Sequence, residues 1–226
     1  MDQHTVVFTA QRTLPGEVKH DELVGLVWAI FSKSKLGEER VQQLHDEHVP
    51  SPFVWSYSLT DNKAAITWSA YPDEIIEAFT EALKSSENKA FTVPGSPYII
   101  KDVYEVEDIN YIPPRMTLHA LSGVQVRHIV DKMLRPYWYE DDPEEWTKSM
   151  EKRVKAKADL YAPGTEHNVK IDRVQTLAVE KKEYLGKEFV TPKYQFRLTA
   201  DPEAMKVALY AGVGQMCGTG FGHMVA

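Results

Sequence analysis

The stretch Gly212-Val213-Gly214-Gln215-Met216-Cys217-Gly218-Thr219-Gly220-Phe221-Gly222 holds five of the chain's twelve glycines in eleven positions. Glycines this dense allow backbone N–H groups to turn outward and approach an anion closely. A short helix is predicted immediately before them, because Asp201 can cap its first turn and Pro202 suits its first position. The sequence therefore predicts a helix over Asp201 to Ala211, a stop at Gly212 in the left-handed helical conformation, and then a glycine-rich loop.

Two common phosphate-binding loops do not fit this segment. A Walker loop requires Lys and then Ser or Thr after its last glycine, but Gly218 is followed by Thr219. A dinucleotide-binding loop lies between a strand and a helix, whereas this segment follows a helix. A flexible glycine tail is the plain alternative, and the apolar Phe221, Met224 and Val225 argue against it because they are suited to burial.

Gly212-Val213-Gly214, followed after five residues by Gly220-Phe221-Gly222, resembles the G-x-G-x5-G-[FY]-G signature of the RAMP-superfamily CRISPR repeat endoribonucleases, the Cas six group. Its position after a short helix and a strand such as Tyr194 to Leu198 resembles the family as well. Many relatives carry Lys or Arg directly after the second glycine, where this chain has Gln215 and Met216. The resemblance implies tandem ferredoxin-like domains that bind RNA.

Periodicity along the chain predicts an α+β fold in which the element order β-α-β-β-α-β, that of a ferredoxin-like (RRM-like) unit, occurs twice. Pro113 and Pro114 separate the units, which gives an N-terminal domain over residues 1–112 and a C-terminal domain with the glycine-rich loop over residues 113–226. The predicted strands are His4–Leu14, Phe53–Leu59, Ala64–Tyr71, Phe91–Val93 with Tyr98–Val106, Met116–Val130, Val169–Val179, Phe189–Leu198 and Phe221–Ala226. The predicted helices are Asp21–Phe31, Glu38–His48, Pro72–Leu83, Pro143–Leu160 and Asp201–Ala211.

Composition places the chain among ordinary globular proteins, with 226 residues, 43% hydrophobic content and one cysteine. The lone Cys217 excludes an internal disulfide and a cysteine zinc cluster, which suits a cytoplasmic protein. No membrane contact is expected, because the strongly apolar run Leu23–Phe31 is too short to span a bilayer.

The net charge of −7 is unevenly distributed. Residues 148–206 contain 13 basic and 9 acidic side chains, whereas the rest of the chain contains 13 basic and 24 acidic ones. Affinity for nucleic acid depends on the local density of positive charge. The sequence therefore predicts one basic working face in the second half of the chain.

The candidate RNA-binding residues are basic side chains and loop glycines. They are Arg127, Lys132, Arg135, Lys148, Lys152, Arg153, Lys155, Lys157, Gly212, Gly214, Gly220 and Gly222. Three- and four-residue spacing puts Lys148, Lys152 and Lys155 on one helix face suited to phosphates, and a solvated face paired with glutamates is the alternative. The aromatic run Tyr137-Trp138-Tyr139 is suited to stacking unpaired bases or to the core.

His45 is the candidate catalytic residue by resemblance. Leu44-His45-Asp46-Glu47, ahead of Phe53-Val54-Trp55-Ser56, resembles the family segment in which a histidine precedes a Phe-x-x-Ser strand and is usually catalytic. Imidazole suits RNA cleavage because, near neutral pH, it can take a proton from a 2′-hydroxyl or give one to a leaving oxygen.

Relatives often add a tyrosine and a lysine to this histidine. Trp28 or Phe31 stands where the tyrosine is expected, and Ser51 or Pro52 stands where the lysine is expected. Lys33 or Lys35 could supply the positive charge that stabilises the reacting phosphate.

The resemblance implies a metal-independent endoribonuclease that needs no cofactor. It would bind and cleave CRISPR repeat RNA in precursor transcripts, giving mature guide RNA with 2′,3′-cyclic phosphate and 5′-hydroxyl ends. Its expected partners are this RNA and other subunits of a CRISPR effector complex, and a homodimer is left open. A non-cleaving RNA-binding subunit of such a complex is the alternative, whereas a cyclic phosphodiesterase would need paired His-x-Thr/Ser motifs, which the sequence lacks.

Overall fold

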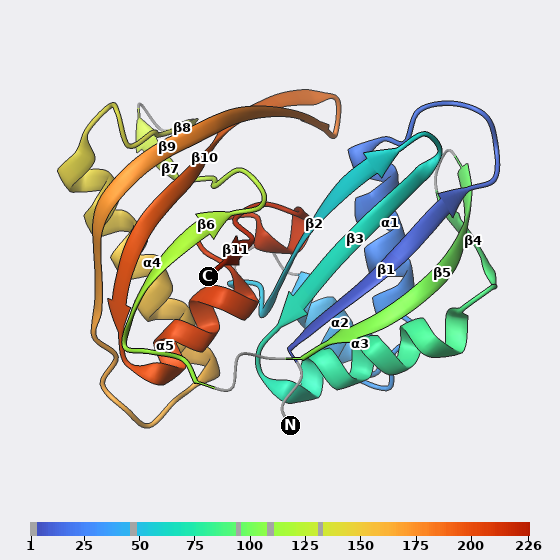
Figure 1. Cartoon of the computed structure of the whole chain (residues 1–226), viewed down its shortest axis with the longest axis horizontal. Helices are drawn as coiled ribbons and strands as arrows, with labels where there is room; N and C mark the ends of the chain where they lie inside the picture. Colours follow the sequence, from blue (N-terminus) through green and yellow to red (C-terminus); the bar gives the residue numbers. More distant parts are fainter. Residues whose placement is uncertain (1–3, 46–48, 94–95, 108–110, 131–132) are drawn as a thin grey trace.

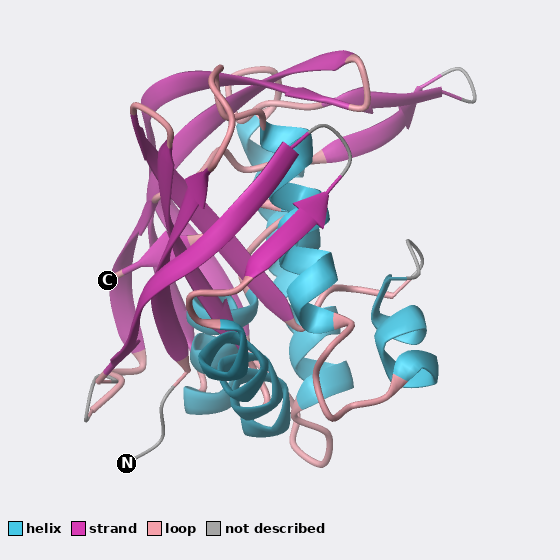
Figure 2. Cartoon of the chain, turned by 90° about the vertical axis from the view of Figure 1, so that its right-hand side faces the viewer, coloured by secondary structure: helices cyan, strands magenta, loops and turns pink. Residues whose placement is uncertain are grey.

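The computed structural model describes residues 4–45, 49–93, 96–107, 111–130 and 133–226. Its two halves lie side by side, the first coloured blue to green and the second yellow-green to red (Figure 1). Each half is a layer of antiparallel strands covered by helices. In the view turned by 90°, the strands gather on one side and most of the helix lies on the other (Figure 2).

The first half is a five-stranded antiparallel sheet in the order β2-β3-β1-β5-β4. Its central strands β1 and β3 lie between β2 and β5, which is the strand order of a ferredoxin-like unit, and β4 is added at the edge. The elements are β1 (Thr5–Arg12), α1 (His20–Phe31), α2 (Glu38–His45), β2 (Phe53–Thr60), β3 (Lys63–Ala70), α3 (Asp73–Ser86), β4 (Ala90–Val93) and β5 (Ser96–Val106).

Alternation of apolar residues explains the central strand of this sheet. Val6, Phe8 and Ala10 of β1 are fully buried, while the residues between them are half-buried, as the two-residue period of a strand requires. Below the sheet, Trp68 of β3 stacks on Phe79 of α3 with ring centroids 3.9 Å apart. These aromatic side chains form the centre of the first hydrophobic core.

The second half repeats the same strand order in a four-stranded sheet, β11-β6-β10-β9, and adds a separate two-stranded sheet of β7 and β8. The elements are β6 (Arg115–Ala120), β7 (Arg127–Val130), β8 (Met133–Pro136), α4 (Pro143–Tyr161), β9 (Val169–Tyr184), β10 (Lys187–Ala200), α5 (Pro202–Lys206), a π-helical turn (Val207–Ala211), a 3-10 turn (Cys217–Thr219) and β11 (Met224–Val225). The predicted α+β fold with two ferredoxin-like units is therefore confirmed. The boundary at residues 112/113 falls between β5 and β6 and stays a prediction.

Three local predictions in the second half were wrong. Met116–Val130 is not one strand, because β6 ends at Ala120 and the chain bends at Leu121 and Ser122. The N–H of the next residue, Gly123, donates to Glu180 Oε1 at 2.5 Å. The closing strand is only the two residues of β11. Gly212 does not end the helix in the left-handed helical conformation, since its φ of 75° is combined with a ψ of 173°.

Side chains of both halves meet at the boundary between the two sheets. His223, beside β11, lies 2.9 Å through Nδ1 from Ser56 Oγ and 3.2 Å through Nε2 from Ser69 Oγ. Burial, and secondarily the charge of Lys182, lowers the pKa of His223 to about 4. This interface seats the C-terminal segment against β2 and β3 of the first half. None of the helices in the described ranges is both long enough and apolar enough to cross a bilayer.

Candidate functional site

His45 is the last residue of α2 and is exposed to solvent. Its ring meets Trp28 of α1 in an edge-on contact with the centroids 4.5 Å apart. Trp28 in turn packs edge-on against Phe53, the first residue of β2, at 5.3 Å. The imidazole is thus supported by an aromatic side chain on one side and open to solvent on another.

The segment from Gly212 to Gly222, called here the glycine loop, reaches the same part of the first half. A side-chain carbon placed on Gly218 would lie 3.1 Å from Ser51 Oγ and 3.5 Å from the Phe53 ring. The loop and His45 therefore contact opposite members of one aromatic pair, Phe53 and Trp28. The structure brings the two predicted features, the histidine and the glycines, to one side of the boundary between the halves.

The loop glycines are required by close packing within the protein. Gly212, Gly214, Gly220 and Gly222 all have φ between 75° and 85°, where other residues are strained. A side-chain carbon on Gly222 would lie 1.9 Å from Val213 O, and one on Gly214 would lie 2.6 Å from Gln125 O. All four glycines are buried. The expectation that they leave the backbone open to RNA is therefore corrected, because the half-exposed residues of the loop are Gln215, Met216 and Thr219.

Three consecutive carbonyl groups of the loop are held by side chains from both halves. Trp55 Nε1 donates to Gly218 O at 3.1 Å, and His20 Nε2 lies 2.9 Å from Thr219 O. From the other half, Lys182 Nζ donates to Gly220 O at 3.0 Å. These contacts turn the carbonyl oxygens, which would repel a phosphate, toward the protein interior.

His20 and Lys182 are both buried beneath the loop. Burial lowers the pKa of His20 to about 4, with a further lowering by the positive charge of Lys182. Burial also lowers the pKa of the Lys182 ammonium, although Glu180 Oε1 lies only 3.1 Å from its Nζ. The imidazole of His20 is therefore uncharged at neutral pH and stabilises the loop through its hydrogen bond to Thr219 O.

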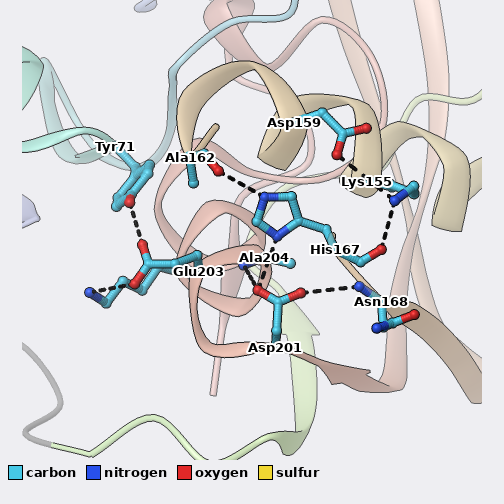
Figure 3. Close-up of polar contacts among 10 residues, drawn as sticks. Tyr71, Lys155, Asp159, Ala162, His167, Asn168, Asp201, Glu203 and Ala204 are labelled. Carbon is cyan, nitrogen blue, oxygen red and sulfur yellow. Dashed lines mark hydrogen bonds and ion pairs between the residues drawn. The ribbon is translucent and has the colours of Figure 1, made fainter. Parts of the chain in front are cut away.

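The basic side chains of α4 divide into an outer and an inner set. Lys148 and Lys152 are exposed, and Lys148 Nζ is paired with Glu144 at 2.6 Å. Lys155 is half-buried and donates to His167 O at 2.8 Å (Figure 3). Arg153 is half-buried and donates to Arg127 O at 3.3 Å, and burial lowers its pKa.

Lys157, expected among the phosphate-binding residues, is only 3% exposed and donates to backbone oxygens of the glycine loop. It does not offer its ammonium at the surface, so this expectation is corrected. Helical spacing explains the outcome: Trp146, Met150 and Val154 form the buried stripe of α4, and Lys157 continues that stripe.

The other predicted cations lie near β7 and β8. Arg127 is half-buried, with its guanidinium 2.6 Å from Met216 Sδ of the glycine loop and above the Phe189 ring at 5.3 Å. Arg135 is exposed on β8, and Lys132 lies outside the described residues. Tyr137 and Tyr139 are half-buried against the second hydrophobic core, which supports the core alternative for these two aromatics.

Lys33 and Lys35, considered as sources of positive charge beside His45, instead contact β4 and α3 of the first half. The Lys33 ammonium lies 3.9 Å above the Phe91 ring of β4, and Lys35 Nζ is 2.9 Å from Glu81 Oε2 of α3. In the described part of the chain, His45 itself makes no hydrogen bond or ion pair. Nor does any group of three or more His, Cys, Asp or Glu side chains among the described residues form a possible metal site.

A second histidine cluster, not anticipated from the sequence, lies at the start of α5 (Figure 3). His167 is buried, with Nδ1 3.0 Å from Asp201 Oδ1 and Nε2 2.9 Å from Ala162 O. Burial lowers the pKa of His167, but the hydrogen bonds to Ala162 O and Asp201 outweigh it and raise the pKa overall. Since Asp201 also caps α5 by accepting from Ala204 N at 3.1 Å, this cluster has a structural explanation.

With this geometry established, comparison with known families is decisive. The model of the family described as "CRISPR associated protein Cas6, C-terminal" matches residues 105–225, more than half of the chain. The chain belongs to the Cas6 family. The matched region includes α4, the β9–β10 hairpin and nearly the whole C-terminal segment with the glycine loop.

Solved structures agree with the Cas6 fold over the whole chain. The structure titled "An RAMP protein binding different RNA substrates" has a TM-score of 0.76 at 14% identity and covers 98% of both chains. A Cas6-related protein from Pyrococcus furiosus gives 0.75 at 15% identity, covering 99% of this chain and 98% of its own. A further "CRISPR associated protein Cas6" gives 0.70 at 15% identity, with the same coverage. No curated protein matches the sequence.

Sequence reasoning missed the residues that hold the Cas6-type glycine loop in place, namely Trp55, His20 and Lys182. Their contacts join positions 38 to 199 residues apart, which no local pattern reports. Only the burial of Lys157 was predictable, because its spacing continues the apolar stripe of α4. The roles assigned to His45 and to the RNA-binding residues other than Lys157 and the loop glycines stay predictions.

Proposed function

We propose that this Cas6-family chain is a metal-independent endoribonuclease that binds CRISPR repeat RNA and cleaves it in precursor transcripts. The observation that carries the proposal is the family match, taken with an exposed histidine, His45, that contacts Trp28, the neighbour of Phe53 on which the glycine loop packs. Structural relatives include one whose title describes binding to RNA substrates and one described as a Cas6 product complex. Because its substrate is a cellular transcript, we expect the protein to act in the cytoplasm.

In the proposed reaction, His45 takes the proton from the 2′-hydroxyl of the nucleotide before the cut, or gives one to the leaving oxygen. The 2′-oxygen attacks the adjacent phosphorus, and the bond from phosphorus to the 5′-oxygen breaks. The products are a 2′,3′-cyclic phosphate and a 5′-hydroxyl, the latter after the leaving oxygen gains a proton. Phosphates would be held by the exposed Lys148 and Lys152 and by arginines beside the loop.

One observation favours a second candidate, a non-cleaving RNA-binding subunit of a CRISPR effector complex. The His45 ring contacts Trp28, and among the described residues no acid, base or lysine makes a hydrogen bond or ion pair with that histidine. Such a subunit would use the same loop and the same cations without needing a catalyst. We propose other effector subunits as partners in either case, and a homodimer remains a prediction.

Incubation of end-labelled repeat RNA with the purified protein in EDTA separates the candidates. The endoribonuclease is expected to cut at one position within the repeat, since its chemistry needs only proton transfer. Binding without cutting would support the non-cleaving subunit. Cutting that requires an added divalent cation would contradict the proposed mechanism.

A further inference from the structure

Lys157 is a charged residue buried in the interior of the second half. Its ammonium is buried beneath the glycine loop and donates to Ala211 O at 2.6 Å, to Gly212 O at 3.0 Å and to Cys217 Sγ at 3.2 Å. An ammonium has three N–H groups, so all of its donors are used. Within the described part of the chain, no carboxylate pairs with it.

The partners of Lys157 lie at the two ends of one arc of the loop. Ala211 ends the π-helical turn and Gly212 follows it, whereas Cys217 begins the 3-10 turn. The Lys157 ammonium is therefore hydrogen-bonded to residues directly before and directly after the arc, residues 213–216. The Cys217 thiol closes the same arc from inside, because its Sγ lies 3.3 Å from Val213 O.

This arc carries the half-exposed side of the loop. Gln215 and Met216 lie on it, and Met216 Sδ contacts the guanidinium of Arg127. Just beyond the arc, Gly218 packs on Ser51 and Phe53, the support of the Trp28–His45 pair. The arc therefore lies between the Arg127 guanidinium of the second half and the contact of Gly218 with the first half.

Burying a charge without an opposite charge costs free energy, which carbonyl dipoles offset only in part. Helix-end carbonyls such as Ala211 O do favour a cation. An apolar side chain would nevertheless continue the stripe of Trp146, Met150 and Val154 without any desolvation of charge. A lysine at this buried position therefore points to a requirement of function for a fixed loop.

We propose that Lys157 is a positioning residue for RNA cleavage: it fixes the arc 213–216, and through it the scissile phosphate, relative to His45. This inference rests on the proposed endoribonuclease function. Lys157 itself touches no RNA in this account. Its loss would therefore slow the cleavage step, because misplacing the reacting groups by about 1 Å can cost roughly 100-fold in rate.

Cys217 provides a direct reporter of the loop, because it is the chain's single cysteine and is buried. The test compares Lys157→Met with the parent and with Lys170→Met, a change at an exposed lysine of β9 that pairs with Thr199 of β10. The first measurement is the rate at which a soluble disulfide reagent modifies Cys217 in the free protein. Loss of a neighbouring cation slows the reaction of a thiol, so faster modification would report an opened loop.

The second measurement is the rate constant for cutting repeat RNA with protein in saturating excess. Under that condition the rate constant does not depend on how much of the protein is folded, so lost stability alone leaves it unchanged. We expect Lys157→Met to be modified about tenfold faster or more, and to cut about 10- to 100-fold more slowly. Repeat affinity should stay within about threefold, and Lys170→Met should match the parent throughout.

Unchanged modification of Cys217 would overturn the inference, and so would faster modification with an unchanged cutting rate. If circular dichroism shows Lys157→Met to be unfolded, both rates are measured instead on Lys157→Gln, which keeps two N–H donors. The same outcomes then support or overturn the inference. A parent protein that binds but never cuts repeat RNA would refute the proposed function and the cleavage role of Lys157. The thiol rates would still show whether Lys157 holds the arc.

Discussion

His45 is the residue on which the proposed chemistry depends. Replacing it with alanine should lower the single-turnover cleavage rate by about 10²- to 10⁴-fold, the usual contribution of a positioned acid or base. Repeat affinity should change only a few fold, because an uncharged imidazole contributes little to phosphate binding. Measured rates and filter-binding affinities of His45→Ala check both expectations.

The matched control is Gln42→Ala, an exposed change one turn earlier on α2. It tests whether loss of a side chain from this helix is itself harmful, and it should leave the rate unchanged. If His45→Ala cuts as fast as the parent, the catalyst lies elsewhere. The role given to His45 by resemblance would then be wrong.

Single residues show where sequence reasoning reaches its limit. The sequence located His45 only through its resemblance to a family segment, since nothing in its spacing distinguishes it from seven other histidines. The density of basic residues on its helix predicts an RNA-binding role for Lys157, although its spacing from Val154 and Met150 assigns it to the buried stripe. His20 gave no local signal, because its partner Thr219 is 199 residues away.

At the scale of elements, the glycine loop depends on contacts that only glycine permits. Gly222→Ala should lower the free energy of unfolding by far more than the roughly 1–2 kcal/mol that positive φ costs. The additional cost arises because its new carbon would lie 1.9 Å from Val213 O. Urea denaturation of the two proteins measures the difference.

Gly37→Ala is the appropriate control, because Gly37 has φ +80° but nothing within 4 Å of an added carbon. It isolates the conformational cost, which should stay at roughly 1–2 kcal/mol. Equal losses in the two variants would show that packing against the loop is unimportant.

The outer face of α4 makes a separate prediction about RNA. Lys152→Glu should weaken repeat binding and reduce the slope of log affinity against log salt by about one unit if Lys152 contacts a phosphate. Lys63→Glu, an identical change at an exposed site in the first half, should leave that slope unaltered. Titrations at several salt concentrations measure both. Identical salt slopes for the two variants would show that the outer face of α4 faces solvent and makes no contact with RNA phosphates.

Elements were predicted better than their boundaries. Alternation and helical period located both sheets and every long helix, because burial against a neighbouring layer imposes those periods locally. The break between β6 and β7 was missed, since it depends on Gly123 meeting Glu180 of a distant strand. The hairpin of β9 and β10 runs longer than predicted because the two strands support each other as far as Leu185 and Gly186.

The molecule as a whole should lose stability in acid. His20 and His223 lie buried at the boundary between the halves, and the pKa of each is lowered to about 4. Their folded pKa is below that of the unfolded chain, near 6.5, so the unfolded state binds more protons between these values. Above pH 6.5 both histidines are uncharged in either state and do not reduce the free energy of unfolding. That free energy falls as the pH drops from 6.5 toward 4, by roughly 3 kcal/mol for each histidine.

Unfolding by urea at several pH values between 4 and 6.5 measures this loss. His223→Asn, which removes one titrating group beside Ser56, should flatten the dependence on pH. His167 does not interfere, because its raised pKa keeps its contribution present below pH 6.5. An unchanged pH dependence in His223→Asn would show that His223 is not held uncharged in the interface.

The central claim, cleavage of repeat RNA by its own 2′-hydroxyl, is tested most directly with one modified RNA. The parent protein is given labelled repeat RNA in EDTA, the cut is mapped, and the same RNA is made with a single 2′-deoxyribose before that position. We predict a 2′,3′-cyclic phosphate on the all-ribose product and no cutting of the modified RNA, which should still bind. Cutting of the 2′-deoxy RNA at that position, or failure to cut either RNA, would contradict the central claim.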